Sequence, residues 1–235
     1  GAEKFFDIKC APSGLKPEAV VMVTTVKALR HHGGAKKDQL PIPSVEKVLL
    51  GCANLGKHLE NMKLFGMNTI VAINSFPEDT DDEIEIIHHF CASYGVKSIL
   101  CKGFSEGGKG MLDLAREVIH SVEHGDSVFK PLYNYDLSLE EKINTIATKI
   151  YGAKEIVYSV KAIRQLKQIK AFGFDAYPVC MAKTPKSLSD DERKIGRPEN
   201  FTITIREFEY ATGAGFIVPI LGEIMRMPGL PNIPA

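Results

Sequence analysis

The sequence of 235 residues contains no tryptophan, carries no net charge and has no long apolar run. Lysine plus arginine and aspartate plus glutamate number 29 each, so no overall positive field attracts nucleic acid or an anionic membrane surface. No segment reaches the roughly 18 apolar residues that a membrane span requires, and no charged start followed by an apolar stretch resembles a signal peptide. Neither nucleic acid nor a membrane is therefore an expected partner.

The five cysteines form no C-x-x-C pair and lie mostly in apolar segments, as reduced buried thiols do. They are Cys10, Cys52, Cys91, Cys101 and Cys180. This pattern favours a reducing compartment, and we expect a cytoplasmic protein. The sequence does not begin with methionine and both ends are abrupt, which predicts a fragment of a longer protein.

Residues 69–80 form the stretch around which the rest is organised. Its apolar run at 70–73 is continuous rather than alternating, which is typical of a strand covered on both faces in a parallel sheet. Thr80 and Glu83 form a capping box that starts a helix, and Gly95 is placed to end it. A second strand at 96–101 follows. We expect an α/β fold in which both strands open onto loops at one sheet edge.

Each of these two loops carries one aromatic residue, Phe76 after the first strand and Phe104 in the glycine-rich loop at 102–110. Ligands of open α/β sheets bind beyond the carboxyl ends of the strands, and two facing rings can sandwich a flat heteroaromatic ligand. The alternative is that both rings pack back onto the core. From the pattern alone this alternative is favoured, because a loop phenylalanine beside glycine or proline is more often packing than function.

Three other segments have more than one interpretation each. The strand expected at 19–25 is interpreted as buried, and it leads to His31 and His32 before a glycine pair. This placement permits anion binding, whereas the spacing of the two histidines does not fit a metal site. Within the helix expected at 45–65, Asn54, His58 and Asn61 form a polar stripe. It bridges to a neighbouring element, lines a site or, as we favour, holds a buried histidine satisfied by amides. The polar loop at 183–198 reaches a phosphate or, as we favour, is simply solvated.

A domain boundary is expected near residue 150. Residues 1–150 form the α/β portion, and 151–235 form a small, truncated α+β domain with strands at 155–159, 177–182 and 201–206 around a helix at 160–172. Phe201, Ile203 and Ile205 alternate with polar residues, which indicates a half-exposed strand.

Several separated motifs give the chain an end-to-end resemblance to the formate–tetrahydrofolate ligase family. Any one of them is weak, but their order and spacing together are specific. They are GAEKF at 1–5, VTTVKALRHHGG at 23–34, NL at 54–55 with His58 and Asn61, VAIN at 71–74 with Phe76, GG at 107–108, IYGA at 150–153, PVCMAKT at 178–184, GAGF at 213–216 and MPGLP at 227–231.

The resemblance implies a cytoplasmic ligase of one-carbon metabolism, which joins formate to tetrahydrofolate with ATP and Mg²⁺ through formyl phosphate. It also implies a P-loop-NTPase-like parallel sheet with flanking helices, a homotetramer and activation by a monovalent cation. No G-x-x-x-x-G-K-[ST] pattern occurs in this sequence, so the ATP site is expected mostly outside it. We therefore assign no catalytic residue and no metal ligand, and expect the chain alone to be inactive.

By the same resemblance, the pterin pocket has Phe76 and Pro77 as one wall and Phe104 as the other, with Leu100 lining it. With the resemblance, we favour the interpretation in which the two rings sandwich a ligand over the one in which they pack back onto the core. The family usually has tryptophan where this chain has Phe104. Lys27 and Arg30 also exchange the usual arginine and lysine, which matters if either makes a bidentate contact. The competing hypothesis is a non-catalytic folate-binding module or subunit.

Overall fold

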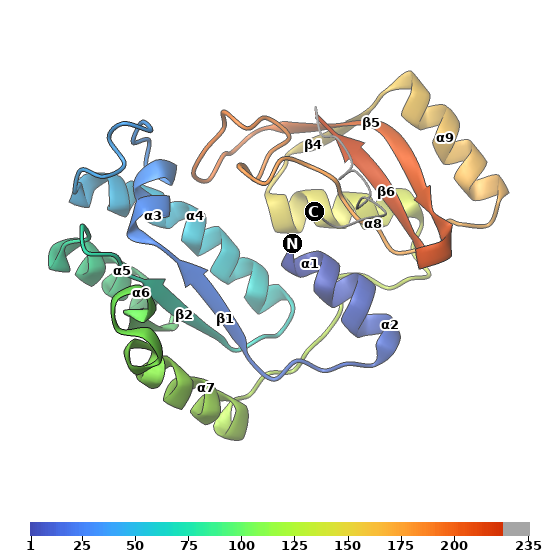
Figure 1. The fold of residues 1–235 in the computed structure, drawn as a ribbon. Helices are drawn as coiled ribbons and strands as arrows, with labels where there is room; N and C mark the ends of the chain where they lie inside the picture. The colour runs from blue at the N-terminus through green and yellow to red at the C-terminus, as the bar shows by residue number, and fades with distance from the viewer. Residues whose placement is uncertain (223–235) are drawn as a thin grey trace, which may run out of the picture.

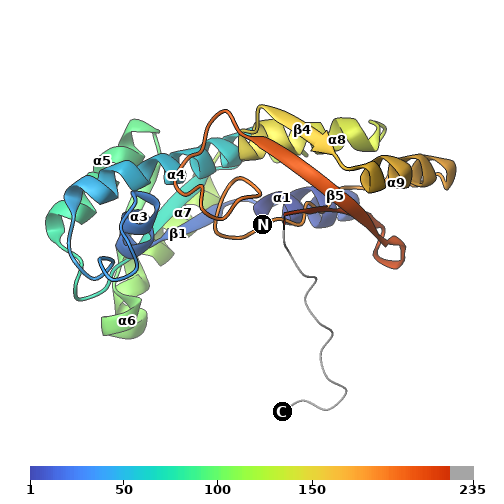
Figure 2. The same ribbon diagram turned by 90° about the horizontal axis from the view of Figure 1, so that it is seen from above.

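The computed structural model describes residues 1–222, so the MPGLP motif at 227–231 lies outside the described residues. Two sheets lie side by side, with the long helix α4 (Val45–Leu64) and the amino-terminal helices between them (Figure 1). Seen from above, the two sheets with their flanking helices, called here the first and second units, follow one another along the length of the molecule (Figure 2). No helix within these residues has the length and apolar character needed to cross a membrane.

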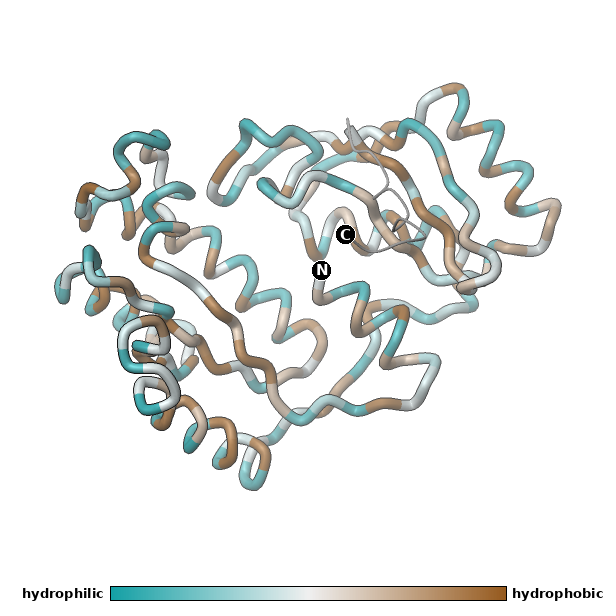
Figure 3. The backbone as a smooth tube through the Cα atoms, in the orientation of Figure 1, coloured by the Kyte–Doolittle hydropathy of each residue, from teal (hydrophilic) through white to brown (hydrophobic). Residues whose placement is uncertain are grey.

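The first sheet has the order β1 (Val20–Thr24), β2 (Thr69–Asn74), β3 (Lys97–Cys101), and all three strands are parallel. Residues 70–73 are buried on both faces, as their continuous apolar pattern predicts. The predicted pair of parallel strands is therefore confirmed, and so is the α/β class. In Figure 3 hydrophobic segments run along the strands of both sheets.

One face of this sheet packs on helices α3 (Val26–His32), α4 and α5 (Asp81–Ser93), whose apolar residues form a core with Val71 and Ile73. Helix α5 starts with the predicted capping box. Just after its last residue, Gly95 adopts a left-handed φ of 68°, which ends the helix as predicted. Helix α7 (Leu112–His124) lies against β2 and β3.

Helix α4 runs unbroken through Gly51, although glycine is unfavourable in a helix interior. The packing of α4 against α3 explains why a glycine is present there. A Cβ atom added at Gly51 would lie 1.9 Å from the backbone oxygen of Leu29, so only glycine allows the two helices to approach this closely.

The predicted burial of β1 is wrong. Val21 is 39% exposed and Val23 is 66% exposed, because β1 is the edge strand and one of its faces is left uncovered by the described residues. Sequence pattern alone does not distinguish an edge strand of valines from a central one.

The second sheet contains β4 (Glu155–Tyr158), β5 (Thr202–Ala211) and β6 (Phe216–Leu221). Strand β4 is parallel to β5, and β6 is antiparallel to it. The alternating burial of β5 confirms the half-exposed strand, with Ile203 and Ile205 inward. The strand expected at 177–182 is instead two isolated bridges to β6, and β6 itself was not predicted.

Helix α9 (Val160–Ala171) flanks β5, and α8 (Leu139–Thr145) continues into π-helical turns at Ile146–Tyr151. The buried residues of α8 and of these turns share one core with β5 and β6. That core also includes Phe6 and Cys10 from the amino-terminal helical segment, which consists of α1 (Ala2–Lys4), π-helical turns at Phe5–Cys10 and α2 (Ala11–Ser13). The domain boundary near residue 150 stays a prediction.

Candidate functional site

The loops after β2 and β3 leave the same edge of the parallel sheet, as predicted. The backbone N–H of Ser75 donates to the oxygen of Cys101 over 3.0 Å, so the two loops start as immediate neighbours. Phe76 and Phe104 then meet, with ring centroids 5.3 Å apart and planes tilted by 49°. Both rings line an open cavity of about 520 Å³, together with Ala72, Asn74 and Met111 among others.

The two rings contact each other directly, since aromatic pairs in contact have centroids about 4.5–7 Å apart. The prediction that they face each other across a gap wide enough for a flat ring is therefore wrong for this structure. Phe104 is 71% exposed and lies in the short helix α6 (Gly103–Glu106), whereas Phe76 is half-buried. A flat ligand can enter between the rings only if they separate.

The other two residues predicted for this pocket lie elsewhere. Pro77 follows Phe76 and is exposed. Leu100 packs against the core formed with α3, α4 and α5, on the opposite face of β3 from Cys101, which lines the cavity. The structure thus brings Phe76 and Phe104 together and does not bring Leu100 to them.

A buried ion pair lies beneath the Phe76 loop. Arg30 on α3 is fully buried, and its Nε and Nη2 atoms donate to the two carboxylate oxygens of Glu83 over 2.8 and 2.6 Å. Its Nη1 donates to the backbone oxygen of Leu40 over 3.0 Å. Glu83 also accepts from the backbone N–H groups of Ser44 and Thr80, over 2.7 and 3.1 Å. Burial by itself raises the pKa of Glu83, but these hydrogen bonds together lower it to about 2.

Asp79 connects this ion pair to Phe76. Its Oδ1 atom lies 3.4 Å from Nη2 of Arg30, and its Oδ2 atom accepts from the backbone N–H of Phe76 over 2.9 Å. Burial raises the pKa of Asp79, although the Phe76 hydrogen bond and the Arg30 charge act in the opposite direction. Sequence reasoning identified Glu83 only as a helix cap and missed Asp79. The available signal was an aspartate three residues after a loop phenylalanine.

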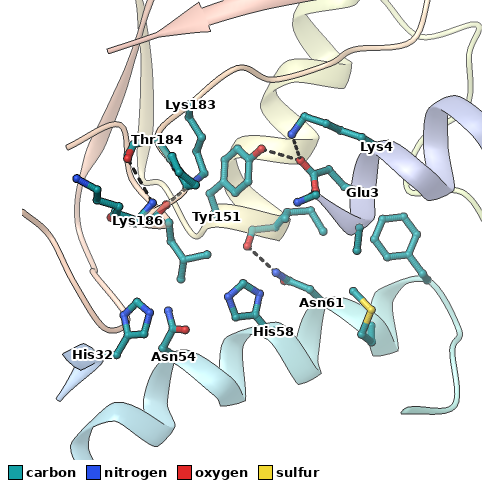
Figure 4. A pocket seen from close by; sticks show the side chains of 18 residues that line it. Glu3, Lys4, His32, Asn54, His58, Asn61, Tyr151, Lys183, Thr184 and Lys186 are labelled. Carbon is teal, nitrogen blue, oxygen red and sulfur yellow. Dashed lines mark hydrogen bonds and ion pairs between the residues drawn. The ribbon is translucent and has the colours of Figure 1, made fainter. Parts of the chain in front are cut away.

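A second cavity, of about 400 Å³, lies between α1, α4 and the loop at 184–188 (Figure 4). Here the favoured interpretation of the polar stripe is wrong, and the alternative that it bridges to neighbouring elements is confirmed. Asn54 and Asn61 donate to the backbone oxygens of Gly196 and Ile150, over 2.7 and 2.9 Å, and neither satisfies His58. His58 is not buried but exposed toward the cavity. Partial desolvation by the cavity walls, aided by nearby positive charges including Lys183, lowers its pKa to about 4.

The loop that closes this cavity is not simply solvated, which corrects the second favoured interpretation. Ser187 and Ser189 are buried. Lys183 donates to the backbone oxygens of Thr184 and Ser187, and its Nζ lies 5.0 Å from the centroid of the Tyr151 ring. Burial lowers the pKa of Lys183 to about 8.

The other two lysines of this cavity are also occupied. Lys4 pairs with Glu3 over 2.9 Å, and Lys186 pairs with Glu192 over 2.8 Å. Each lysine that lines this cavity thus has a hydrogen-bond or ion-pair partner among the described residues, whereas the first cavity is lined by two aromatic rings.

The paired histidines lie near the second cavity. Nδ1 of His32 accepts from the backbone N–H of Gly196 over 3.1 Å, which ties α3 to the loop at 183–198. Within residues 1–222 no three histidine, cysteine or carboxylate side chains are grouped so that they could hold a metal ion.

Comparison with known proteins adds independent findings. A family model described as formate–tetrahydrofolate ligase matches residues 1–235. The chain is 51% identical over 235 residues to the protein named formate–tetrahydrofolate ligase in Staphylococcus aureus strain NCTC 8325 / PS 47. Its identity to the proteins of that name in strains MSSA476 and MRSA252 is the same. These alignments cover 100% of this chain and 42% of each relative, so the chain spans less than half the length of the relatives it matches.

Proposed function

The chain belongs to the formate–tetrahydrofolate ligase family, and from that premise we propose that it supplies the pterin pocket of an ATP-dependent ligase. The reaction joins formate to tetrahydrofolate through formyl phosphate and gives 10-formyltetrahydrofolate, ADP and phosphate. One observation carries the role of this chain: Phe76 and Phe104 come from different loops and meet at the carboxyl edge of a parallel sheet, where such sheets bind ligands.

The chemistry needs little covalent help from side chains. Transfer of a formyl group from a mixed anhydride requires that the amine of the folate be held against the formyl carbon, which is a positioning task. Two aromatic walls perform that task for a flat pterin, since stacking fixes the plane of the ring. Pro77 adjoins the Phe76 wall in the proposed pocket, whereas Leu100 is not part of it because it packs on the opposite face of β3. Because the rings touch in the structure, pterin binding requires them to part.

The remaining parts of the proposal are supported by the family relationship. They are ATP with Mg²⁺, a monovalent cation, formate, a homotetrameric assembly and a cytoplasmic location, the last also supported by four buried thiols. Mg²⁺ is usually held by one or two carboxylates together with the substrate phosphates, so we place its site with the ATP, mostly outside this chain. The sequence lacks the P-loop pattern. We therefore assign no catalytic step to this chain's residues.

A second candidate is a folate-binding module or subunit without catalysis, and the absence of the P-loop pattern from these 235 residues is compatible with both candidates. An assay of the purified chain with ATP, formate and tetrahydrofolate tests whether the chain is catalytic by itself. We expect no 10-formyltetrahydrofolate from it. Product at a rate near that of a full-length relative would show that the chain is a complete catalyst.

Tetrahydrofolate affinity, measured by calorimetry on this chain, tests the pocket itself. A stacked ring face contributes roughly 0.5–1.5 kcal/mol beyond its buried area, so Phe76→Ala and Phe104→Ala should each weaken binding about tenfold or more. Phe172→Ala is the matched control, since Phe172 is 63% exposed and lies in the second unit, after α9. Thermal melting confirms that the variants fold. If both alanine variants bind as tightly as the parent, the pocket lies elsewhere.

A further inference from the structure

The turn that carries Phe76 is tied to a fully buried ion pair. Two hydrogen bonds close the turn: the backbone N–H of Phe76 donates to Oδ2 of Asp79, and the backbone N–H of Asp79 donates to the oxygen of Phe76 over 3.0 Å. Together they fix the backbone at Phe76, and hence the direction in which its ring leaves the loop. The Asp79 side chain is 1% exposed, so water does not compete for these bonds.

We propose that Asp79, held by Arg30, is a positioning residue that fixes the Phe76 ring as the immobile wall of the folate pocket. This inference rests on the proposed function of that ring. Asp79 itself touches no ligand in this proposal; it acts through the backbone of Phe76.

The residue type at position 30 matters for this role. A guanidinium has five N–H donors in a rigid plane, whereas a lysine ammonium has three on a flexible stem. Arg30 uses its donors toward four separate acceptor groups: the Glu83 carboxylate, the Leu40 oxygen, Asp79 and, over 3.5 Å, the Glu78 oxygen. A lysine at this position keeps the charge but cannot hold the helix α5 start and the Phe76 turn at once.

The opposite wall has no such anchor. Each hydrogen bond and ion pair formed by the described residues 102–110 stays within that loop or joins it to its neighbour Leu112. Lys102 and Gly110 close its neck through a bond of 3.1 Å, and Ser105 and Glu106 bond back to Lys102. Because the Phe76 wall is fixed, the Phe104 loop is the one that must move to let a pterin enter between the rings.

The absence of tryptophan from the sequence allows a test that does not need folate. Phe76→Trp and Phe104→Trp each introduce a single indole, whose acrylamide quenching reports its access to solvent. Adding Asp79→Ala should raise the quenching constant of the Phe76→Trp protein about twofold or more, because the turn loses its closing bond. The Phe104→Trp protein should change little, since that position is already 71% exposed.

Asp79→Asn is the conservative variant. It keeps a side-chain oxygen for the Phe76 N–H and loses only the charge toward Arg30, so quenching should rise by less than with alanine. Equal quenching with and without Asp79→Ala in the Phe76→Trp protein would overturn the proposal. So would an equal rise at both reporter positions. Thermal melting accompanies each variant, and if the alanine variant does not fold, the asparagine variant decides by the same criterion.

Tetrahydrofolate affinity provides the second arm. Asp79→Ala should weaken binding about tenfold in the parent, a change of about 1.4 kcal/mol, but less than about twofold in a Phe76→Ala background. An equal loss in both backgrounds contradicts an action through Phe76. If Phe76→Ala leaves affinity unchanged, the proposed function fails, while the quenching experiment still decides whether Asp79 positions the ring.

Discussion

The two loops that leave the parallel sheet bring their aromatic rings to the same place but are held there by different means. The Phe76 loop is tied to Arg30 and Glu83, which lie on separate helices and are fully buried. The Phe104 loop is held by bonds within itself, and its ring is largely exposed. One wall of the proposed pocket is thus fixed by long-range contacts and the other by local ones.

This difference has a physical consequence for binding. A pre-organised wall has already lost its conformational freedom, so a ligand stacks on it without a further ordering cost. A locally held wall can adapt to the ligand but must be ordered when the ligand binds. The contact between the two rings shows why both properties are needed: a pocket with two fixed rings in contact would admit nothing.

The largest expected effect breaks the fixed wall. Arg30→Met leaves Glu83 buried without its partner, which should lower the free energy of unfolding by about 3–5 kcal/mol. Arg197→Met is the matched control, because Arg197 also binds Glu60 through two bonds, of 2.7 and 2.9 Å, but at the surface. There the loss should be about 0–1 kcal/mol. Urea unfolding measures both, and equal losses would contradict the distinction.

The second-largest expected effect is that acid weakens the ion pair between Arg30 and Glu83. The pKa of Glu83 is lowered from its ordinary 4.5 to about 2, so its contribution to stability is complete above about pH 4.5 and is lost as the pH falls toward 2. Arg30 and Asp79 are charged groups that face it. Glu83→Gln should be less stable at neutral pH and should show a smaller decline between about pH 5 and 2. Urea midpoints across that range test this, and parallel curves for parent and variant would refute it.

The sequence was sufficient for features encoded by near neighbours. The capping box at Thr80 and Glu83, the continuous apolar run of β2 and the two loop aromatics lie within short windows, and the structure confirms the elements they predict. Adjacent parallel strands bring their carboxyl ends to one edge, so the meeting of the two loops also followed from the pattern.

Features that depend on distant partners could not be predicted. Arg30 lies 49 positions from Asp79 and 53 from Glu83, and nothing local marks them as contacts. The exposure of β1 depends on which elements cover it, and the face on which Leu100 lies depends on strand register. Strand β6 was missed because its pairing with β5, rather than its own pattern, identifies it.

Proteolysis should show a smaller difference between the loops. Each has an exposed glutamate, Glu78 or Glu106, so one glutamate-specific protease compares them in a single sample. Cleavage after Glu106 should be on the order of tenfold faster, because local opening of a self-contained loop costs less than release of an anchored one. Arg30→Lys leaves both cleaved bonds unchanged and should accelerate cleavage after Glu78 only. Faster cleavage after Glu78 in the parent chain would reverse the assignment of the fixed wall.

The smallest effect concerns ring size at the two walls. Phe104 is mostly exposed on a loop bonded to itself, so Phe104→Trp should be accommodated by loop movement and should hold or improve tetrahydrofolate affinity, by up to about threefold from added stacking area. The same change at Phe76 enlarges a ring whose backbone is fixed by Asp79, so it should weaken binding, because the turn cannot shift to make room. Calorimetry on both variants measures the difference. Tighter binding by the Phe76→Trp variant together with weaker binding by the Phe104→Trp variant would contradict the assignment of Phe76 as the fixed wall.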